Sequence, residues 1–149
     1  MVQRRRVCPD TKEASAMDPQ HRQMLETAYK AFENCQSYAL FRNIQLKPDS
    51  RNPLKKIFGT KTSVYTGCFS DDWKITLGKD SNPFPDYHAT GTSLAVLANR
   101  ISWFFNLHGP SVNFDSTCSS SMMALDAAYQ GLRNRDADTV SASGTSRCN

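Results

Sequence analysis

The sequence lacks any apolar run near the roughly 18 residues that a membrane-spanning helix needs. Arg4, Arg5 and Arg6 stand near the start, but no apolar segment follows them as it does in a secretory signal peptide. Hydrophobic residues make up 39% of the chain and charged residues 21%, which is ordinary for a globular chain. We therefore expect a protein of the cytoplasm that has no membrane partner.

The sequence also lacks a cysteine framework. Its cysteines are odd in number and widely spaced, with no C-x-x-C pair and no Cys/His spacing that suits zinc. A disulfide scaffold would be denser, so reduced thiols fit better. We expect no bound metal and no directly bound cofactor. The cysteines are Cys8, Cys35, Cys68, Cys118 and Cys148.

A concentrated basic patch is missing as well, since the net charge of +4 is modest. Arg4 to Arg6 and Lys55, Lys56 and Lys61 are scattered, with no aromatic interleaving and no known RNA-binding motif. A nucleic-acid-binding module is therefore the weakest of the function classes considered, and we expect no nucleic acid partner.

What is present is an alternation of helix and strand patterns. Residues 1–16 have no clear period and are expected to be irregular. A helix is predicted from Pro19, with Asp18 as its N-cap and Asn34 at its end. Residues 36–52 read as an irregular insertion. The buried stripe of the helix is expected to be Leu25, Ala28, Tyr29 and Phe32.

Three strands and two further long helices follow. Residues 62–69, 111–115 and 138–144 have strand patterns, and a short helical turn is expected near Trp73. Ser93 is predicted to cap a helix whose core stripe is Leu94, Leu97, Ile101 and Phe104, while Trp103 and Phe105 point toward a second contact. The last helix is predicted to bury Met122, Leu125, Tyr129 and Leu132. This alternation, with long crossovers, predicts an α/β fold with parallel pairing.

Cys118 is the candidate catalytic residue because it lies between the second predicted strand and the last helix. The N–H groups and dipole of a helix N-terminus favour the thiolate and can stabilise an oxyanion. Small Ser119, Ser120 and Ser121 would leave room for a substrate. The residues alone leave an alternative open, in which Cys118 is a buried structural thiol beside the capping residues Ser116 and Thr117.

The stretch "DSTCSSSMMAL" resembles the active-site motif of β-ketoacyl synthases, usually D-[ST]-A-C-S-S-S followed by a helix. "MDPQHRQMLETAYKAFEN", "GTKTSVYTGCFSDDW" and "YHATGTSLAVLANRISWFFNLHGPS" are similar to the segments that precede this motif in ketosynthases of modular polyketide synthases. The third stretch is closest in character to the iterative type I enzymes of filamentous fungi. The chain is identified on these residues as part of the N-terminal half of a ketosynthase domain, spanning residues 17–149.

The resemblance implies a partial thiolase-like fold with layered helices and a mixed sheet, usually in a homodimer. It also implies that Cys118 takes an acyl group as a thioester. Two histidines from H-G-T-G-T and G-H motifs then assist decarboxylation of a malonyl unit, and the resulting carbanion attacks the acyl-cysteine. The implied partners are an acyl carrier protein and acyl and malonyl thioesters carried on phosphopantetheine.

The sequence departs from the family in its histidines. His21, His88 and His108 lie in neither of the family's histidine motifs, so we expect surface or packing roles for them. The start of the chain and residues 36–52 do not match the family either. Two interpretations stay open: a fragment of a condensing enzyme, or a non-catalytic relative that only binds acyl groups or dimerises.

Overall fold

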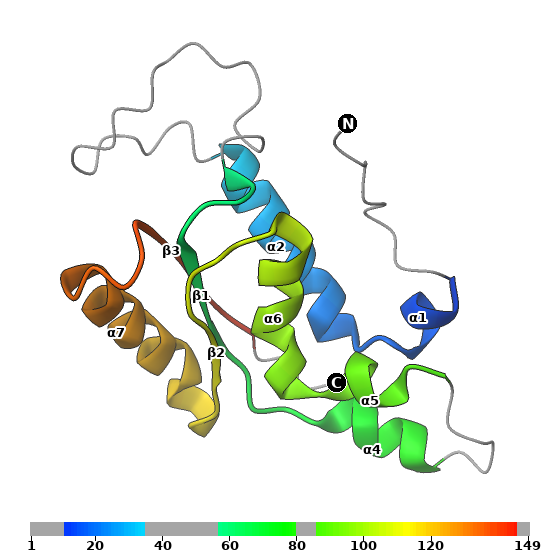
Figure 1. Ribbon diagram of the computed structural model, residues 1–149. Coiled ribbons are helices and arrows are strands. Elements are labelled where there is room, and N and C mark those ends of the chain that lie inside the picture. The colour runs from blue at the N-terminus through cyan, green and yellow to red at the C-terminus, as the bar shows by residue number, and fades with distance from the viewer. Residues whose placement is uncertain (1–10, 35–56, 80–85, 146–149) are drawn as a thin grey trace, which may run out of the picture.

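Helices and strands alternate along the part of the chain that the computed structural model describes, residues 11–34, 57–79 and 86–145 (Figure 1). The expected insertion at 36–52 and the first ten residues lie outside these ranges. In chain order the elements are α1 (Thr11–Ala16), α2 (Pro19–Asn34), β1 (Thr62–Gly67), α4 (Asp72–Lys79), α5 (His88–Thr92), α6 (Leu94–Phe105), β2 (Ser111–Phe114), the 3-10 turn η2 (Thr117–Ser119), α7 (Ser120–Arg133) and β3 (Thr139–Gly144).

The three described strands form one sheet in the order β2-β1-β3, and both pairings are parallel. Helices α4 to α6 connect β1 to β2, and α7 connects β2 to β3, so each crossover is long enough for parallel pairing. Every residue of the central strand β1 is buried. The α/β prediction is confirmed, although the antiparallel pairing of a mixed sheet does not occur among these strands.

Helices cover both faces of the sheet (Figure 1). On one face, α2 and α6 pack against Val64 of β1 in the larger apolar cluster. On the other face, Ala124 and Ala128 of α7 pack against Tyr65 of β1. Successive side chains of a strand point to opposite faces, so Val64 and Tyr65 pack against different helix layers.

The predicted buried face of α7 is wrong. Met122, Leu125, Tyr129 and Leu132 are exposed, and the buried residues of the helix are Ser120, Ala124, Ala128 and Gly131. These small residues recur at steps of three and four, so they form a helical stripe of their own. Their small side chains let the helix axis approach the sheet closely, whereas the large apolar side chains lie on the exposed face of the helix.

Helix α6 buries most of the stripe predicted for it. Leu97, Ile101 and Phe104 are buried and Leu94 is partly buried. Phe105 was expected to point elsewhere, but its side chain is 0% exposed, whereas Trp103 is 64% exposed. The Phe105 ring packs edge-on against Phe32 of α2, with 4.8 Å between the ring centroids. Phe105 is therefore a core residue of α6 in addition to the predicted stripe.

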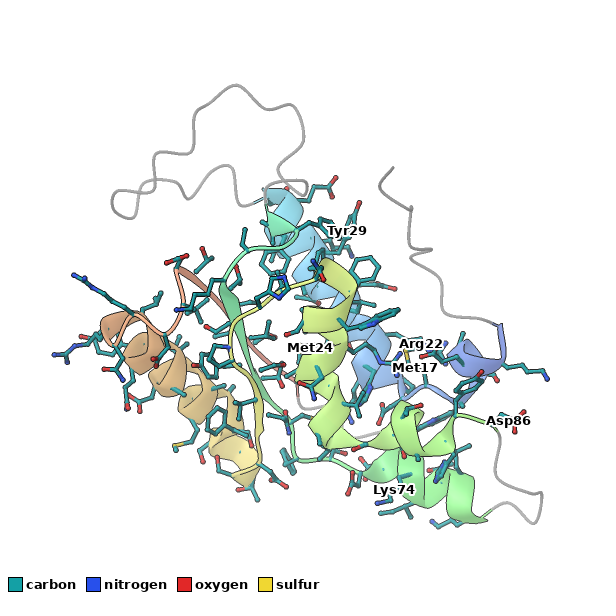
Figure 2. All side chains as sticks on the ribbon, in the orientation of Figure 1. Met17, Arg22, Met24, Tyr29, Lys74 and Asp86 are labelled. Carbon is teal, nitrogen blue, oxygen red and sulfur yellow. The ribbon has the colours of Figure 1, made fainter. Side chains whose placement is uncertain are left out.

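The segment before α2 is more ordered than the sequence predicted, because Thr11–Ala16 form helix α1. Asp18 caps α2 as predicted, since its Oδ1 accepts a hydrogen bond of 2.7 Å from the Gln20 N–H. Met24, labelled in Figure 2, is among the buried residues of α2 and accepts a hydrogen bond at Sδ from the Ser143 hydroxyl, 2.9 Å away. The expected turn near Trp73 is the longer helix α4.

Candidate active site at the Cys118 turn

Cys118 lies on the short turn between a strand and a helix, as the sequence predicted. Strand β2 ends at Phe114, η2 spans Thr117–Ser119, and α7 begins at Ser120. We call residues 115–119 the Cys118 turn. The cysteine is exposed and free of any disulfide, so the alternative of a buried structural thiol does not fit this structure.

Hydroxyl groups of the neighbouring residues hold the Cys118 turn. The Ser120 hydroxyl donates to the Thr117 carbonyl at 2.6 Å and accepts a hydrogen bond of 2.9 Å from the Ser116 N–H. The Ser119 hydroxyl donates to the Ser116 carbonyl at 2.8 Å. Ser120 was expected to leave room for a substrate, but it is 3% exposed, and its buried hydroxyl forms hydrogen bonds to the backbone of the turn.

Thr117 has a left-handed backbone, with φ of 55°. This region is unfavourable for a β-branched residue, at a cost of about 1–2 kcal/mol. The Thr117 hydroxyl donates to the Ser116 carbonyl at 2.7 Å, which ties the side chain back onto the turn.

The carboxyl ends of β1 and β2 are joined close to the turn. Asn113 of β2 accepts a hydrogen bond from the Thr66 hydroxyl at 2.9 Å, and its Nδ2 donates to the Cys68 carbonyl at 3.3 Å. The Cys68 N–H donates to the Phe114 carbonyl at 3.1 Å. The strand end that leads into the turn is therefore anchored to the central strand.

The second described thiol, Cys68, has a different environment. Its side chain is 0% exposed, and its Sγ donates to Gln20 Oε1 at 3.1 Å. Burial raises the pKa of the Cys68 thiol, and the carboxylates of Asp18, Asp71 and Asp115 act in the same direction. Of the two described cysteines, only Cys118 is both accessible and placed at a helix N-terminus.

Two of the three histidines lie away from the Cys118 turn. His21 is buried on α2, across the sheet from α7, and His108 is an exposed residue that precedes β2 at the amino ends of the strands. His88 begins the short helix α5. The expectation of packing or surface positions is confirmed for His21 and His108.

The described residues hold no cluster of three or more potential metal ligands and no helix that could span a membrane. Two surface hollows of about 230 and 450 Å³ lie beside α4, with Trp73 in the lining of one and Lys74 in that of the other. Neither lining includes Cys118. The candidate site is therefore identified by the exposed thiol and its place between β2 and α7, and not by a hollow.

Two glycines beside the turn were missed by the sequence reasoning. Gly67 and Gly144 end β1 and β3, and each lies against the first residues of α7. The available signal was a glycine closing a strand, which often marks a close approach of another backbone.

The chain belongs to the β-ketoacyl synthase family, since the family model described as "Beta-ketoacyl synthase, N-terminal domain" matches residues 9–149. It is similar to a highly reducing polyketide synthase from Didymella fabae, at 41% identity over 134 residues. It is also similar to the highly reducing polyketide synthase cnsI of Penicillium expansum, at 40% identity over 135 residues. The resemblance to fungal polyketide synthases is thereby confirmed.

Solved ketosynthases share the fold. The structure matches the ketosynthase from module 6 of the bacillaene synthase from Bacillus subtilis 168 with a TM-score of 0.71 and 32% identity, over 93% of this chain. It matches the oxazolomycin ketosynthase domain OzmH KS7 of a Streptomyces with a TM-score of 0.69 and 27% identity. The partial thiolase-like fold is thus confirmed.

The chain is short beside these proteins. The match takes in 90% of this chain but only 6% of the Didymella protein, and 91% of this chain but only 5% of the Penicillium protein. It spans 20% of the bacillaene ketosynthase chain. The chain therefore corresponds to a part of a ketosynthase domain in much longer relatives.

Proposed function

We propose that Cys118 is the acyl-accepting nucleophile of a polyketide synthase ketosynthase domain. The observation that carries this proposal is the position of Cys118, exposed on a strand-to-helix turn within "DSTCSSS", in a chain of the β-ketoacyl synthase family. The 14-residue helix α7 begins two residues after Cys118 and has no acidic residue in its first turn, and a helix N-terminus stabilises negative charge that develops nearby.

The first step is a thioester exchange. The Cys118 thiolate attacks the carbonyl carbon of an acyl group carried on phosphopantetheine, and a new C–S bond forms to Cys118. The bond to the carrier sulfur breaks, and that sulfur leaves as a thiolate that takes up a proton. Backbone N–H groups at the start of α7 are suited to stabilise the transient oxyanion. The donor is an acyl carrier protein, as the resemblance implies.

The second step is decarboxylative condensation. A malonyl thioester loses carbon dioxide, and the resulting carbanion attacks the acyl-Cys118 carbonyl while the Cys118 thiolate departs. The family assigns the stabilisation of the enolate to two histidines, and the 149 residues contain neither of their motifs. We therefore expect the chain alone to accept an acyl group slowly and not to condense it.

A second candidate is a non-catalytic role in acyl binding or dimerisation. The comparisons match polyketide synthases and ketosynthase domains and give no support to this second candidate. A homodimer and a cytoplasmic location also stay predictions, the first on the family resemblance and the second on the reduced cysteines.

The test is self-acylation of the purified 149-residue chain. The chain is incubated with a labelled short acyl thioester of N-acetylcysteamine and, separately, with labelled malonyl thioester. Label should appear on Cys118, disappear in Cys118→Ala and persist in Cys68→Ala, and no carbon dioxide should be released.

Labelling that is unchanged in Cys118→Ala would reject the nucleophile assignment. Carbon–carbon bond formation that depends on Cys118 would reject the view that the histidine motifs are required.

A further inference from the structure

Two glycines on neighbouring strands face the first turn of α7 at the same level of the sheet. Gly67 ends β1 and Gly144 ends β3, and the two are paired in the parallel register. Neither has a positive φ, since Gly59 is the glycine with positive φ among the described residues. Their backbones would thus accept alanine, and only the space around them demands glycine.

That space is filled by the residues that follow Cys118. A Cβ built on Gly67 would lie 2.5 Å from the Ser120 carbonyl oxygen and 2.6 Å from the Ser121 nitrogen, both backbone atoms. A Cβ on Gly144 would overlap the Ser121 Cβ, with the Ser121 Cα at 3.2 Å. Real Cβ atoms essentially never approach within 3.0 Å, so either alanine would displace the start of α7.

A displacement of Ser120 would reach Cys118 through two hydrogen bonds. The Ser120 hydroxyl donates to the Thr117 carbonyl at 2.6 Å and accepts from the Ser116 N–H at 2.9 Å, and these two residues directly precede Cys118 in the turn. Ser120 is 3% exposed, so it has little room to adjust its side chain independently of its backbone.

We propose that Gly67 and Gly144 are positioning residues, which hold the Cys118 turn in its reactive place through Ser120 and Ser121. This inference rests on the proposed function of Cys118. Cys118 is not among the nearest neighbours of the Cβ built on either glycine. The glycines let the start of α7 lie directly on the sheet, and this contact fixes where the Cys118 side chain and the helix N-terminus stand relative to each other. A shift of about 1 Å between reacting groups can cost on the order of a hundredfold in rate.

Two other glycines supply matched controls. Gly109 precedes β2, and a Cβ there would lie 2.5 Å from the Thr62 carbonyl oxygen, at the opposite end of β1 from Gly67. Its substitution places the same kind of backbone overlap far from the Cys118 turn. Gly78 on α4 has no atom within 4 Å of the built Cβ, so Gly78→Ala introduces no overlap.

The experiment measures two rates in the 149-residue chain and in each alanine variant. One is acylation of Cys118 by the short acyl thioester, and the other is its alkylation by iodoacetamide. Both are normalised to the folded fraction from circular dichroism. Gly67→Ala and Gly144→Ala should slow acylation by on the order of tenfold or more, whereas Gly109→Ala and Gly78→Ala should keep the wild-type rate per folded chain.

Rescue separates positioning from general destabilisation. The overlap at Gly144 involves the Ser121 side chain, so Ser121→Gly should restore much of the rate in Gly144→Ala. The overlap at Gly67 involves backbone atoms, so Ser121→Gly should not restore Gly67→Ala. This comparison remains decisive if Gly67→Ala does not fold, because the Gly144 pair is tested by itself.

Wild-type rates in folded Gly67→Ala and Gly144→Ala would overturn the inference, as would an equal slowing in Gly109→Ala. Failure of the wild-type chain to acylate Cys118 would count against the proposed function instead. In that case the iodoacetamide rates across the same variants still test whether the glycines position the thiol.

Discussion

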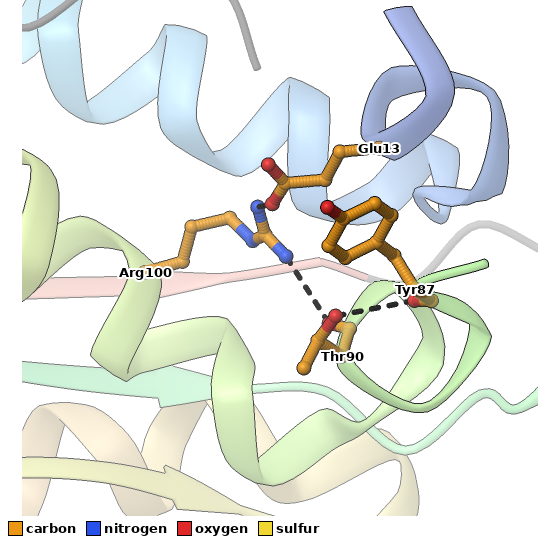
Figure 3. A network of polar contacts seen from close by, with 4 residues as sticks. All are labelled: Glu13, Tyr87, Thr90 and Arg100. Atoms are coloured by element: carbon orange, nitrogen blue, oxygen red, sulfur yellow. Dashed lines mark hydrogen bonds and ion pairs between the residues drawn. The ribbon is translucent and has the colours of Figure 1, made fainter. Parts of the chain in front are cut away.

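The Arg100 guanidinium of α6 lies 2.7 Å from the Glu13 carboxylate of α1 (Figure 3). Arg100 also donates to the Thr90 carbonyl of α5 at 3.1 Å, and the Thr90 hydroxyl donates to the Tyr87 carbonyl at 3.1 Å. The side chains of the pair are 11% and 29% exposed. One arginine therefore joins α6 to the two short helices α1 and α5.

Loss of this ion pair should weaken the fold. Glu13→Gln removes the carboxylate but leaves the mostly buried Arg100 charged, so the free energy of unfolding should fall by about 1–3 kcal/mol. Urea unfolding of the full chain, followed by circular dichroism, measures it. Glu26→Gln on the exposed face of α2 is the control and should change stability by less than about 0.5 kcal/mol. Equal effects of both changes would contradict a structural role for the pair.

His21 predicts a loss of stability in acid. Burial lowers the pKa of His21 from 6.5 to about 4, and the positive charge of Arg100 acts in the same direction. The unfolded chain therefore takes up this proton at a higher pH than the folded chain does. Stability is retained above the unfolded value and is lost as the pH falls from 6.5 towards about 4, by about 3 kcal/mol in total.

The comparison is between the wild-type chain and His21→Leu, by urea unfolding at about pH 7 and about pH 4.5. The variant should lose less stability than wild type over this interval. Burial raises the pKa of Asp18, so protonation of this carboxyl in acid favours the folded chain, opposite to the effect of His21. Asp18 is present in both proteins, so its contribution cancels in the comparison. His108→Gln, at an exposed position, should keep the wild-type loss. An identical acid loss in His21→Leu would rule out His21 as its source.

Local signals predicted the candidate site well. Asp18 at the start of α2 and Cys118 between β2 and α7 depend on a few neighbouring residues, and both lie where the sequence placed them. The face of α7 could not be predicted in this way. The helix carries a large apolar stripe and a stripe of small residues, and only the packing distance to the sheet selects the small one. The meeting of Gly67 with Gly144 likewise depends on the register of strands far apart in the sequence.

The two described thiols should differ in reactivity. Cys118 is exposed, whereas Cys68 is buried and its thiol pKa is raised by burial. Limiting iodoacetamide should modify Cys118 in the native chain and reach Cys68 only after unfolding in urea. Peptide mapping by mass spectrometry measures both sites, with Cys118→Ala as the control. Comparable native labelling of Cys68 would contradict the buried position that the structure gives it.

Relief of the left-handed backbone at Thr117 should stabilise the chain. Asparagine tolerates this conformation better than a β-branched residue, so Thr117→Asn should raise the free energy of unfolding by about 1 kcal/mol. Thr27→Asn is the matched control, because Thr27 is exposed inside α2, where no such strain exists and no gain is expected. A loss of stability in Thr117→Asn would mean that the hydrogen bond from the Thr117 hydroxyl to Ser116 outweighs the strain.

Two leucines on α6 and α7 test which face of each helix is buried. Leu97 is 1% exposed on α6, and Leu125 is 54% exposed on α7, although the sequence predicted both for the core. Leu97→Ala should cost about 2–5 kcal/mol through lost burial and a cavity. Leu125→Ala should cost less than about 1 kcal/mol, because it opens no cavity and alanine favours the helix.

The reciprocal change is at Ala124, the buried neighbour of Leu125, which is 0% exposed. Ala124→Leu should cost about 1–3 kcal/mol, because the added carbons have no space between α7 and the sheet. Urea unfolding of the full chain measures all three variants. If Leu125→Ala cost as much as Leu97→Ala while Ala124→Leu cost nothing, α7 would present its large apolar face to the sheet. The close contact of Ser120 and Ser121 with the paired glycines would then be lost with it.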